Sequence, residues 1–202
     1  IIANRYIAGT TINHAVKTIK KINTQNQSAT LDILGEHTKD LESCIQITNE
    51  YIEILNQIEI NNLNCNVSIK PSHIGSDINK DTAINNFKKI QNYAIKTNNF
   101  VRLDMENSGI TDLTLNIYKE LIKINKNSGI VIQAYLHRSE NDIESLPENI
   151  NIRLCKGIYN EDKSIAIKDP DKINKNYIKL LLMIFEKNIY VGIATHDKKL
   201  IK

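Results

Sequence analysis

Short apolar runs alternate with longer amphipathic stretches along the whole chain, and this alternation limits the possible folds more than any other feature. The short runs are bounded by turn residues, as buried strands are, and the longer stretches repeat apolar residues at helical spacing. Strands that alternate with helices predict parallel strands joined by crossover helices. The expected strands are 31–35, 66–72, 100–105, 130–135, 150–156 and 190–194. The expected helices are 12–22, 41–54, 81–97, 111–124, 141–145 and 172–187.

The placement of glycines separates the two common parallel architectures. A dinucleotide-binding sheet would carry G-x-G-x-x-G after a strand, but Gly35, Gly75 and Gly157 each stand alone. We therefore expect an α/β fold of the (β/α)8 TIM-barrel type. Such a barrel typically needs about 250 residues, whereas this chain has 202 and opens a further helix directly after its sixth strand. The expectation is one barrel domain over residues 1–202, truncated after strand six.

Composition and charge disfavour several other classes of protein. A hydrophobic fraction of 41% in 202 residues supports a sizeable core. The net charge of +3 is spread without a block of like charges, which disfavours nucleic-acid binding. The three cysteines form no C-x-x-C pair, so we expect a reducing compartment and neither a disulfide framework nor a zinc knuckle. No apolar stretch reaches the roughly 18–20 residues of a membrane span, and the N-terminus lacks a signal-peptide pattern.

Polar side chains stand where the expected strands end. They are Lys70, Asp104, Gln133, Arg153 and Lys156. Because the carboxyl ends of parallel strands meet at one mouth of a barrel, these side chains are expected to converge there. A cluster of cations with one carboxylate and one amide suits an anionic ligand, and the amide offers a donor and an acceptor that match the edge of a heterocycle. The chain is therefore predicted to be an enzyme.

Some of these residues also have purely structural interpretations. Lys70 could be a surface lysine at a strand end, and Arg102 could form an ion pair with Asp104 inside the barrel. Gln133 could be satisfied by neighbouring backbone groups. Both readings of each residue stay open at the level of the sequence.

Metal binding and nucleophilic catalysis are weakly indicated. Thr195-His196-Asp197 offers suitable groups, but adjacent strand residues point to opposite faces, and neither H-x-H nor H-E-x-x-H occurs. We therefore predict no metal. Cys155 is expected to be buried packing, because no G-x-S-x-G elbow occurs and its basic neighbours Arg153 and Lys156 are expected to alternate away from it.

Seven segments, taken together and in this order, resemble the proline dehydrogenase family. Each lies at a strand end or turn, and together they span nearly the whole chain. They are Arg5-Tyr6-Ile7-Ala8-Gly9, Leu31-Asp32-Ile33-Leu34-Gly35-Glu36, Ser68-Ile69-Lys70, Arg102-Leu103-Asp104-Met105-Glu106, Ile132-Gln133-Ala134-Tyr135, Arg153-Leu154-Cys155-Lys156-Gly157-Ile158-Tyr159 and Ala194-Thr195-His196-Asp197.

The resemblance implies a flavoprotein oxidoreductase on a (β/α)8 barrel. Members of this family oxidise L-proline to Δ1-pyrroline-5-carboxylate, the first step of proline catabolism. Hydride is expected to move from C5 of proline to N5 of FAD, and the electrons to pass to a quinone. The implied location is the cytoplasm, with peripheral contact to the inner membrane.

The resemblance also implies roles for individual residues. Lys70 would help to hold the proline carboxylate, and Asp104 and Arg153 match active-site positions of the family. The Arg153 guanidinium would favour the negative charge that grows on the flavin as hydride arrives. Asp104 would organise Lys70 and Arg153. The positions expected to touch FAD are Met105, Gln133, Arg153, Cys155, Lys156, Gly157, Thr195 and His196.

The chain also departs from the family pattern. Pro71 and Asn107 replace an aliphatic residue and an aspartate, and the sequence lacks the two closing strands and the arginine-bearing helix of the family. From this we expect that the chain alone binds flavin poorly, turns over little proline and associates through open strand edges. Two alternatives remain: a Schiff-base barrel aldolase that uses Lys70 or Lys156, and a non-catalytic barrel fragment. Oligomeric state, electron acceptor and the choice between proline and hydroxyproline stay open.

Overall fold

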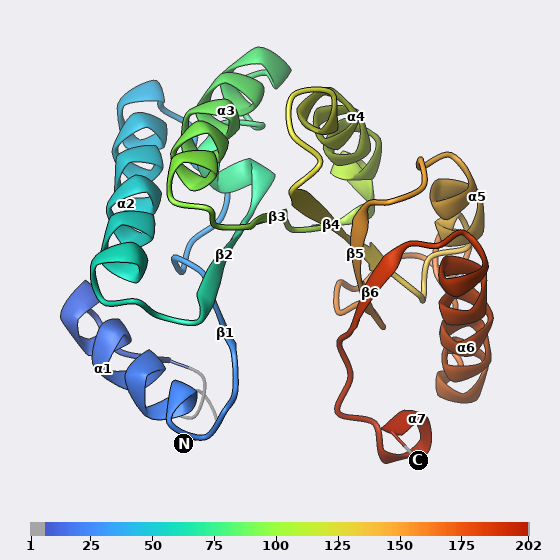
Figure 1. Ribbon diagram of the computed structural model, residues 1–202. Helices are drawn as coiled ribbons and strands as arrows, with labels where there is room; N and C mark the ends of the chain where they lie inside the picture. Colours follow the sequence, from blue (N-terminus) through green and yellow to red (C-terminus); the bar gives the residue numbers. More distant parts are fainter. Residues whose placement is uncertain (1–6, 202) are drawn as a thin grey trace. The chain divides into compact units, whose positions relative to one another are not determined.

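The computed structural model describes residues 7–201, and the chain divides into two compact units, Ile1–Val101 and Arg102–Lys202 (Figure 1). Arg5 and Tyr6, which open the first family-like segment, lie outside the described residues. Within the described residues, six strands alternate with helices in chain order, as the sequence predicts. Each unit is described in turn.

The first unit contains a parallel pair of strands with helices between and around them. Strand β1 pairs with β2 in parallel, and Ala29 lies opposite Cys65. A short 3-10 helix, Pro71–Ile74, follows β2 directly. The elements are α1 (Ile12–Asn23), β1 (Ala29–Leu31), α2 (Leu41–Ile60), β2 (Cys65–Ile69) and α3 (Lys80–Lys96).

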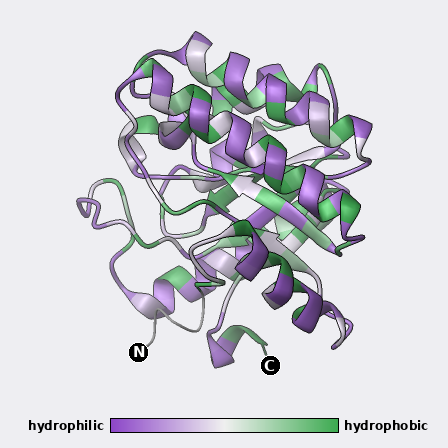
Figure 2. Cartoon of the chain, turned by 90° about the vertical axis from the view of Figure 1, so that its left-hand side faces the viewer, coloured by the Kyte–Doolittle hydropathy of each residue, from purple (hydrophilic) through white to green (hydrophobic). Residues whose placement is uncertain are grey.

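Side-chain caps and apolar faces explain why the helices of the first unit form. The carboxylate of Asp40 accepts a 2.8 Å hydrogen bond from the Ser43 amide and so caps the start of α2. Asn79 caps α3 in the same way. Hydrophilic and hydrophobic residues are interspersed along these helices (Figure 2), and the apolar face includes the fully buried Tyr51 and Phe87.

The second unit is built on three parallel strands with β5 in the middle. Strand β5 pairs in parallel with β4 on one side and with β6 on the other. Strand β3 begins with the last residue of the first unit and is followed by a 3-10 turn, Ser108–Ile110. The elements are β3 (Val101–Leu103), α4 (Thr111–Ile122), β4 (Ser128–Gln133), α5 (Ser139–Glu144), β5 (Asn151–Cys155), α6 (Pro170–Glu186), β6 (Tyr190–Ile193) and α7 (Lys198–Ile201).

The register of β4 and β5 decides which side chains share a face. Val131 lies opposite Arg153, and Gln133 lies opposite Cys155. Because side chains alternate along a strand, Gln133, Arg153 and Cys155 belong to one face. Ile152 and Leu154 occupy the other face of β5 and are fully buried. The expectation that Arg153 alternates away from Cys155 is therefore wrong, since residues two apart on a strand point the same way.

Several predicted boundaries are also wrong. The first strand is not 31–35 but Ala29–Leu31, since these residues find partners on β2 and the chain then turns through Gly35 at φ 151°. The second strand ends at Ile69 because Pro71 begins a 3-10 helix. Ser128 and Gly129 belong to β4 rather than to a turn before it. The helix predicted at 41–54 continues to Ile60. Between residues 7 and 201, no helix has both the length and the apolar character needed to cross a bilayer.

Candidate active site

Arg153 and Asp104 form the central ion pair of the second unit. Arg153 lies in β5, and Asp104 directly follows β3. Nη2 of Arg153 donates to Oδ1 of Asp104 at 2.9 Å, and both side chains are about three-quarters buried, at 25% and 22% exposure. The structure thus brings these two predicted site residues into contact. Arg102 is buried beside them and donates from Nη1 to Oδ1 of Asn151 at 2.9 Å. Burial lowers the pKa of Arg102 to about 10.

Gln133 at the end of β4 is buried with only part of its hydrogen-bonding capacity used. Its Nε2 donates to the Met105 carbonyl at 3.4 Å. Its Oε1 is buried and has no hydrogen-bond partner among the described residues. Neighbouring backbone groups therefore satisfy the amide donor of Gln133 but leave its acceptor oxygen without a hydrogen bond. A buried acceptor without a partner is uncommon in proteins and marks a place where a ligand donor would fit.

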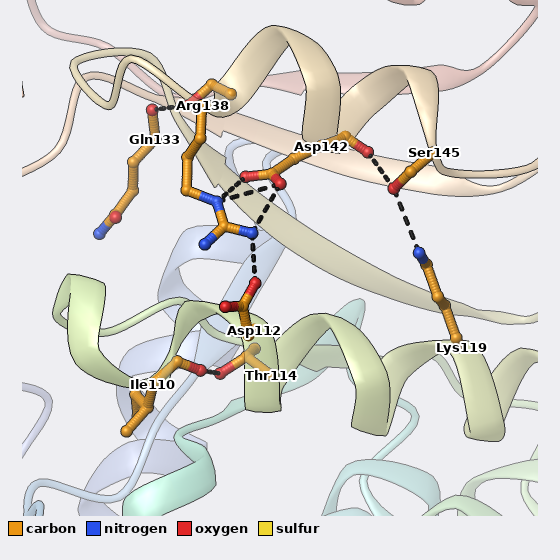
Figure 3. Close-up of polar contacts among 9 residues, drawn as sticks. Ile110, Asp112, Thr114, Lys119, Gln133, Arg138, Asp142 and Ser145 are labelled. Carbon is orange, nitrogen blue, oxygen red and sulfur yellow. Dashed lines mark hydrogen bonds and ion pairs between the residues drawn. The ribbon is translucent and has the colours of Figure 1, made fainter. Parts of the chain in front are cut away.

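A polar network supports the end of β4 from the side of α4 and α5. The Ser139 hydroxyl donates to the Gln133 carbonyl. The neighbouring Arg138 donates from Nε to Asp142 at 2.9 Å and also pairs with Asp112 of α4 (Figure 3). These carboxylates raise the pKa of the Arg138 guanidinium above its usual value. The carboxamide of Gln133 lies outside this network in Figure 3, so the network holds its backbone without occupying its side chain.

Lys156 follows β5 and is held by a carboxylate that follows β6. Its ammonium donates to Oδ2 of Asp197. The same oxygen accepts a 2.9 Å hydrogen bond from Nδ2 of Asn174 in α6. The Thr195 hydroxyl accepts the Asp197 amide at 3.0 Å, and His196 is exposed.

Cys155 and Gly157 are shaped by close packing. Cys155 is only partly buried as a residue, but burial of its thiol raises the pKa to about 11 and leaves almost no thiolate at neutral pH. Gly157 has φ 105°, and a Cβ placed there would lie 2.1 Å from Cδ1 of Tyr135. Only glycine fits this position, both for its backbone conformation and for the ring beside it.

Lys70 belongs to the first unit, where it pairs with the carboxylate of Asp32 directly after β1. The fully buried Tyr51 of α2 donates from its hydroxyl to the other oxygen of Asp32 at 2.8 Å. The Lys70 side chain is 16% exposed. The interpretation of Lys70 as a surface lysine is therefore wrong, because a partly buried ion pair orders its amine.

Three residues that organise the strand-end cations were not assigned from the sequence. Asp32 and Asp197 lie within the family-like segments, so a carboxylate one strand away from each lysine was a usable signal. Asn174 lies in the predicted helix 172–187 and carried no signal, since its partner follows a different strand.

The fold and these side chains define a class of protein: a parallel β/α protein of the barrel type, with paired ionic groups at the carboxyl ends of its strands. Comparison with known proteins narrows the class. The chain belongs to the proline dehydrogenase family, whose profile, described as "Proline dehydrogenase", matches residues 15–201.

Curated relatives agree with this assignment. "Proline dehydrogenase 2" of Bacillus subtilis subsp. natto is 36% identical over 202 residues, which cover 100% of this chain and 66% of the relative. "Proline dehydrogenase" of Deinococcus radiodurans is 29% identical over 206 residues, which cover 99% of this chain and 66% of that protein. The chain thus spans about two thirds of the length of these relatives.

Solved structures confirm the expected fold class. A crystal structure of proline utilization A from Bdellovibrio bacteriovorus, inactivated by N-propargylglycine, superposes with a TM-score of 0.87 at 24% identity over 96% of this chain and 25% of that protein. Proline utilization A from Corynebacterium freiburgense gives a TM-score of 0.75 at 20% identity over 89% of this chain and 22% of that protein. The fold is that of a (β/α)8-type barrel, of which this chain supplies six strands.

Proposed function

We propose that this protein takes part in the FAD-dependent oxidation of L-proline to Δ1-pyrroline-5-carboxylate. The observation that carries the proposal is the arrangement on one face of β4 and β5. There, a guanidinium held by a carboxylate shares the face with a buried carboxamide oxygen that has no partner. The proposed reaction is taken from the family to which the chain belongs, and this arrangement of side chains is compatible with it.

The residues fit a flavin. The unpartnered Oε1 of Gln133 suits an N–H group at the edge of the ring system, and the Arg153 guanidinium suits the region of the ring that becomes negative. The proposed contacts are Met105, Gln133, Arg153, Cys155, Lys156, Gly157, Thr195 and His196. When bound, the flavin would supply the chemistry by accepting the hydride that leaves proline.

The chain's own groups would bind, orient and stabilise charge. Asp104 accepts a hydrogen bond from Arg153, so we assign it to orienting the guanidinium rather than to removing a proton. A guanidinium fixed in this way stabilises negative charge that develops nearby, and no reorganisation is needed during the reaction. Lys70, held by Asp32, would bind the substrate carboxylate through a charge-assisted hydrogen bond.

The Schiff-base alternative receives no support from the two lysines. Lys70 and Lys156 each donate to a carboxylate of the chain, whereas the amine of a Schiff-base lysine must be able to attack a carbonyl carbon. We therefore favour the flavin reaction. We further propose that the electron acceptor is a quinone at the inner face of the membrane, that the protein is cytoplasmic, and that residues 1–202 form part of one barrel domain.

The test is proline-dependent dye reduction by the purified protein in the presence of FAD. Arg153→Met should lower the rate by about a hundredfold, because a fixed charge that stabilises the transition state is lost. Lys70→Met should mainly raise the KM for proline. Lys179→Met, which removes an exposed lysine that pairs with Glu140, is the matched control and should change neither constant.

The alternatives predict different results in the same preparation. A Schiff-base aldolase would show no flavin absorbance, and borohydride would trap its substrate on a lysine. Because the chain alone is expected to turn over little proline, the assay uses saturating FAD and a high protein concentration. A non-catalytic barrel fragment would reduce no dye even under these conditions. Either result would refute the proposed reaction.

A further inference from the structure

The carboxylate of Asp197 collects hydrogen bonds from three elements of the second unit. Oδ2 accepts from the Lys156 ammonium after β5 and from Asn174 of α6 at 2.9 Å. Oδ1 accepts from the Lys199 backbone amide in α7 at 2.8 Å. Asp197 itself lies directly after β6. A single side chain thus links the ends of two strands to two helices.

This carboxylate is permanently charged at physiological pH. The Lys156 ammonium, the Lys199 amide and the Asn174 carboxamide together hold the pKa of Asp197 far below its ordinary value. Its charge is therefore available to hold Lys156 at neutral pH.

Asn174 is a buried polar residue at a position where an apolar side chain would be more stable. It is 8% exposed and lies on the buried face of α6 with Tyr177. Its Nδ2 donates a hydrogen bond to Asp197, while its Oδ1 is buried without a hydrogen-bond partner among the described residues. An apolar side chain would pack there without leaving an acceptor unsatisfied. The retained contact is the one to Asp197, which points to a role in holding that carboxylate.

Lys156 is held by Asp197 and still has N–H donors with which it can bind a ligand. An ammonium has three N–H donors, and Asp197 is the one hydrogen-bond partner of Lys156 among the described residues 7–201. The side chain is 29% exposed. A lysine has four rotatable side-chain bonds and loses much freedom when it binds a ligand. A carboxylate that fixes the amine beforehand removes part of that loss, so the remaining donors are pre-organised for an anion.

We infer that Asp197 and Asn174 are positioning residues that hold the Lys156 ammonium for the anionic diphosphate of the cofactor. The inference rests on the proposed function, because FAD supplies the diphosphate. Asn174 acts through Asp197, and Asp197 acts through Lys156.

The first measurement needs no flavin. Limited acetylation of the flavin-free protein, followed by mass spectrometry, reports how firmly the Lys156 amine is held by its partner. Asp197→Asn should raise the acetylation rate at Lys156 about fivefold, since the amine is no longer held in the ion pair. Asn174→Ala, which leaves both charges in place, should raise it about twofold. The matched control is Asp171→Asn, which removes another carboxylate of the same unit that pairs with exposed Lys199. It should leave the rate at Lys156 unchanged.

The second measurement compares two flavins by fluorescence titration, up to about 1 mM so that weak binding is also seen. Asp197→Asn should raise the Kd for FAD about five- to tenfold and leave the Kd for riboflavin, which has no phosphate, unchanged. In a Lys156→Met background, Asp197→Asn should have no further effect on FAD binding, because its target is gone. Circular dichroism confirms that each variant is folded.

The outcomes separate the two proposals. Unchanged acetylation, unchanged FAD affinity or tighter FAD binding in Asp197→Asn overturns the positioning role. Tighter binding would show that the carboxylate acts only by repelling the diphosphate. Equal losses for FAD and riboflavin would overturn the assignment to the diphosphate. If the unaltered protein binds neither flavin while Asp197→Asn still exposes Lys156, the proposed function fails and the hold of Asp197 on Lys156 stands.

Discussion

Gln133 is a residue whose burial costs stability and whose chemistry suits a ligand. Replacing it with leucine removes a buried acceptor that has no partner, so Gln133→Leu should leave the free energy of unfolding unchanged or raise it by up to about 1 kcal/mol. The same change should weaken FAD binding about tenfold, since one hydrogen bond to the ring is lost. Urea unfolding and flavin titration measure the two effects.

Gln91 provides the matched control for this prediction. It is 1% exposed, lies in α3 of the first unit, and also carries a buried amide oxygen. Gln91→Leu should leave the flavin Kd unchanged. If Gln133→Leu destabilises the fold by several kcal/mol and leaves flavin binding intact, the residue is structural.

The cysteines should resist alkylation in the native state. Burial raises the pKa of Cys65 to about 12 and of Cys155 to about 11, and it also raises the pKa of Cys44. Iodoacetamide attacks the thiolate, so labelling at pH 8 should be at least about a hundredfold slower than in urea. Mass spectrometry of timed samples checks this, and rapid labelling of native Cys155 at pH 8 would contradict it.

The same shifts give a pH dependence of stability. Because the folded thiols have a higher pKa than the unfolded value of 9.0, their contribution is fully present below pH 9 and is lost as the pH rises toward 11 and 12. The free energy of unfolding should therefore fall between pH 9 and 11. Cys65→Ala should make that fall smaller.

At this scale the sequence predicts functional groups better than their partners. Lys70, Asp104, Arg153 and Lys156 were predictable because each follows or ends an apolar run. The partners of Lys70 and Lys156 depend on how neighbouring strands are paired, and only the presence of Asp32 and Asp197 in the family-like segments indicated them. The bond from Asn174 to Asp197 joins residues 23 positions apart and has no local signature.

One arginine, Arg138, links helices α4 and α5 through ion pairs. Arg138 bridges Asp142, whose side chain is 9% exposed, and Asp112 (Figure 3). Arg138→Met should destabilise the protein by about 2–3 kcal/mol, because it leaves the buried Asp142 carboxylate without its charged partner. Urea unfolding measures the loss. Lys179→Met breaks the exposed pair between α6 and Glu140 of α5, and it should cost less than about 1 kcal/mol. Equal costs for the two variants would argue against the network.

Helices were more predictable than strands. The helices begin within about two residues of their predicted starts, since caps such as Asp40 and apolar faces are local signals. The predicted start of β1 was two residues too late, because the apolar residues between Asp32 and Gly35 resemble the end of a strand. Only the pairing with β2 shows where the strand lies. Pro71 was read into a strand although its ring cannot continue the ladder.

For the molecule as a whole, the exposed ends of β6 predict how the chain behaves at high concentration. Tyr190 and Ile193 are 67% and 54% exposed on a strand. Exposed apolar strands favour edge-to-edge association. Ile193→Lys should therefore reduce self-association of the chain in sedimentation velocity across a concentration series. Ile178→Lys replaces an isoleucine of α6 that is 48% exposed, and it should have little effect. If both variants act equally, association is not a property of the strand.

The fold class could be predicted because it depends on the order of elements rather than on their boundaries. Strands alternate with helices from β1 to β6, and that order survives boundary errors of several residues. The pair of Arg153 with Asp104 was expected from the family resemblance, whereas the pairs of Lys70 with Asp32 and of Lys156 with Asp197 were not predicted, because they follow from register and side-chain packing within each unit.

The pairing of strand-end cations with carboxylates changes how such a protein responds to its solvent. Lys70, Arg153 and Lys156 each carry a counterion supplied by the chain itself. Beyond the Debye length of about 8 Å at physiological ionic strength, each pair acts as a dipole and not as a net charge. Chloride and free phosphate therefore gain little by accumulating there, and an approaching ligand is selected by the geometry of its contacts more than by long-range attraction.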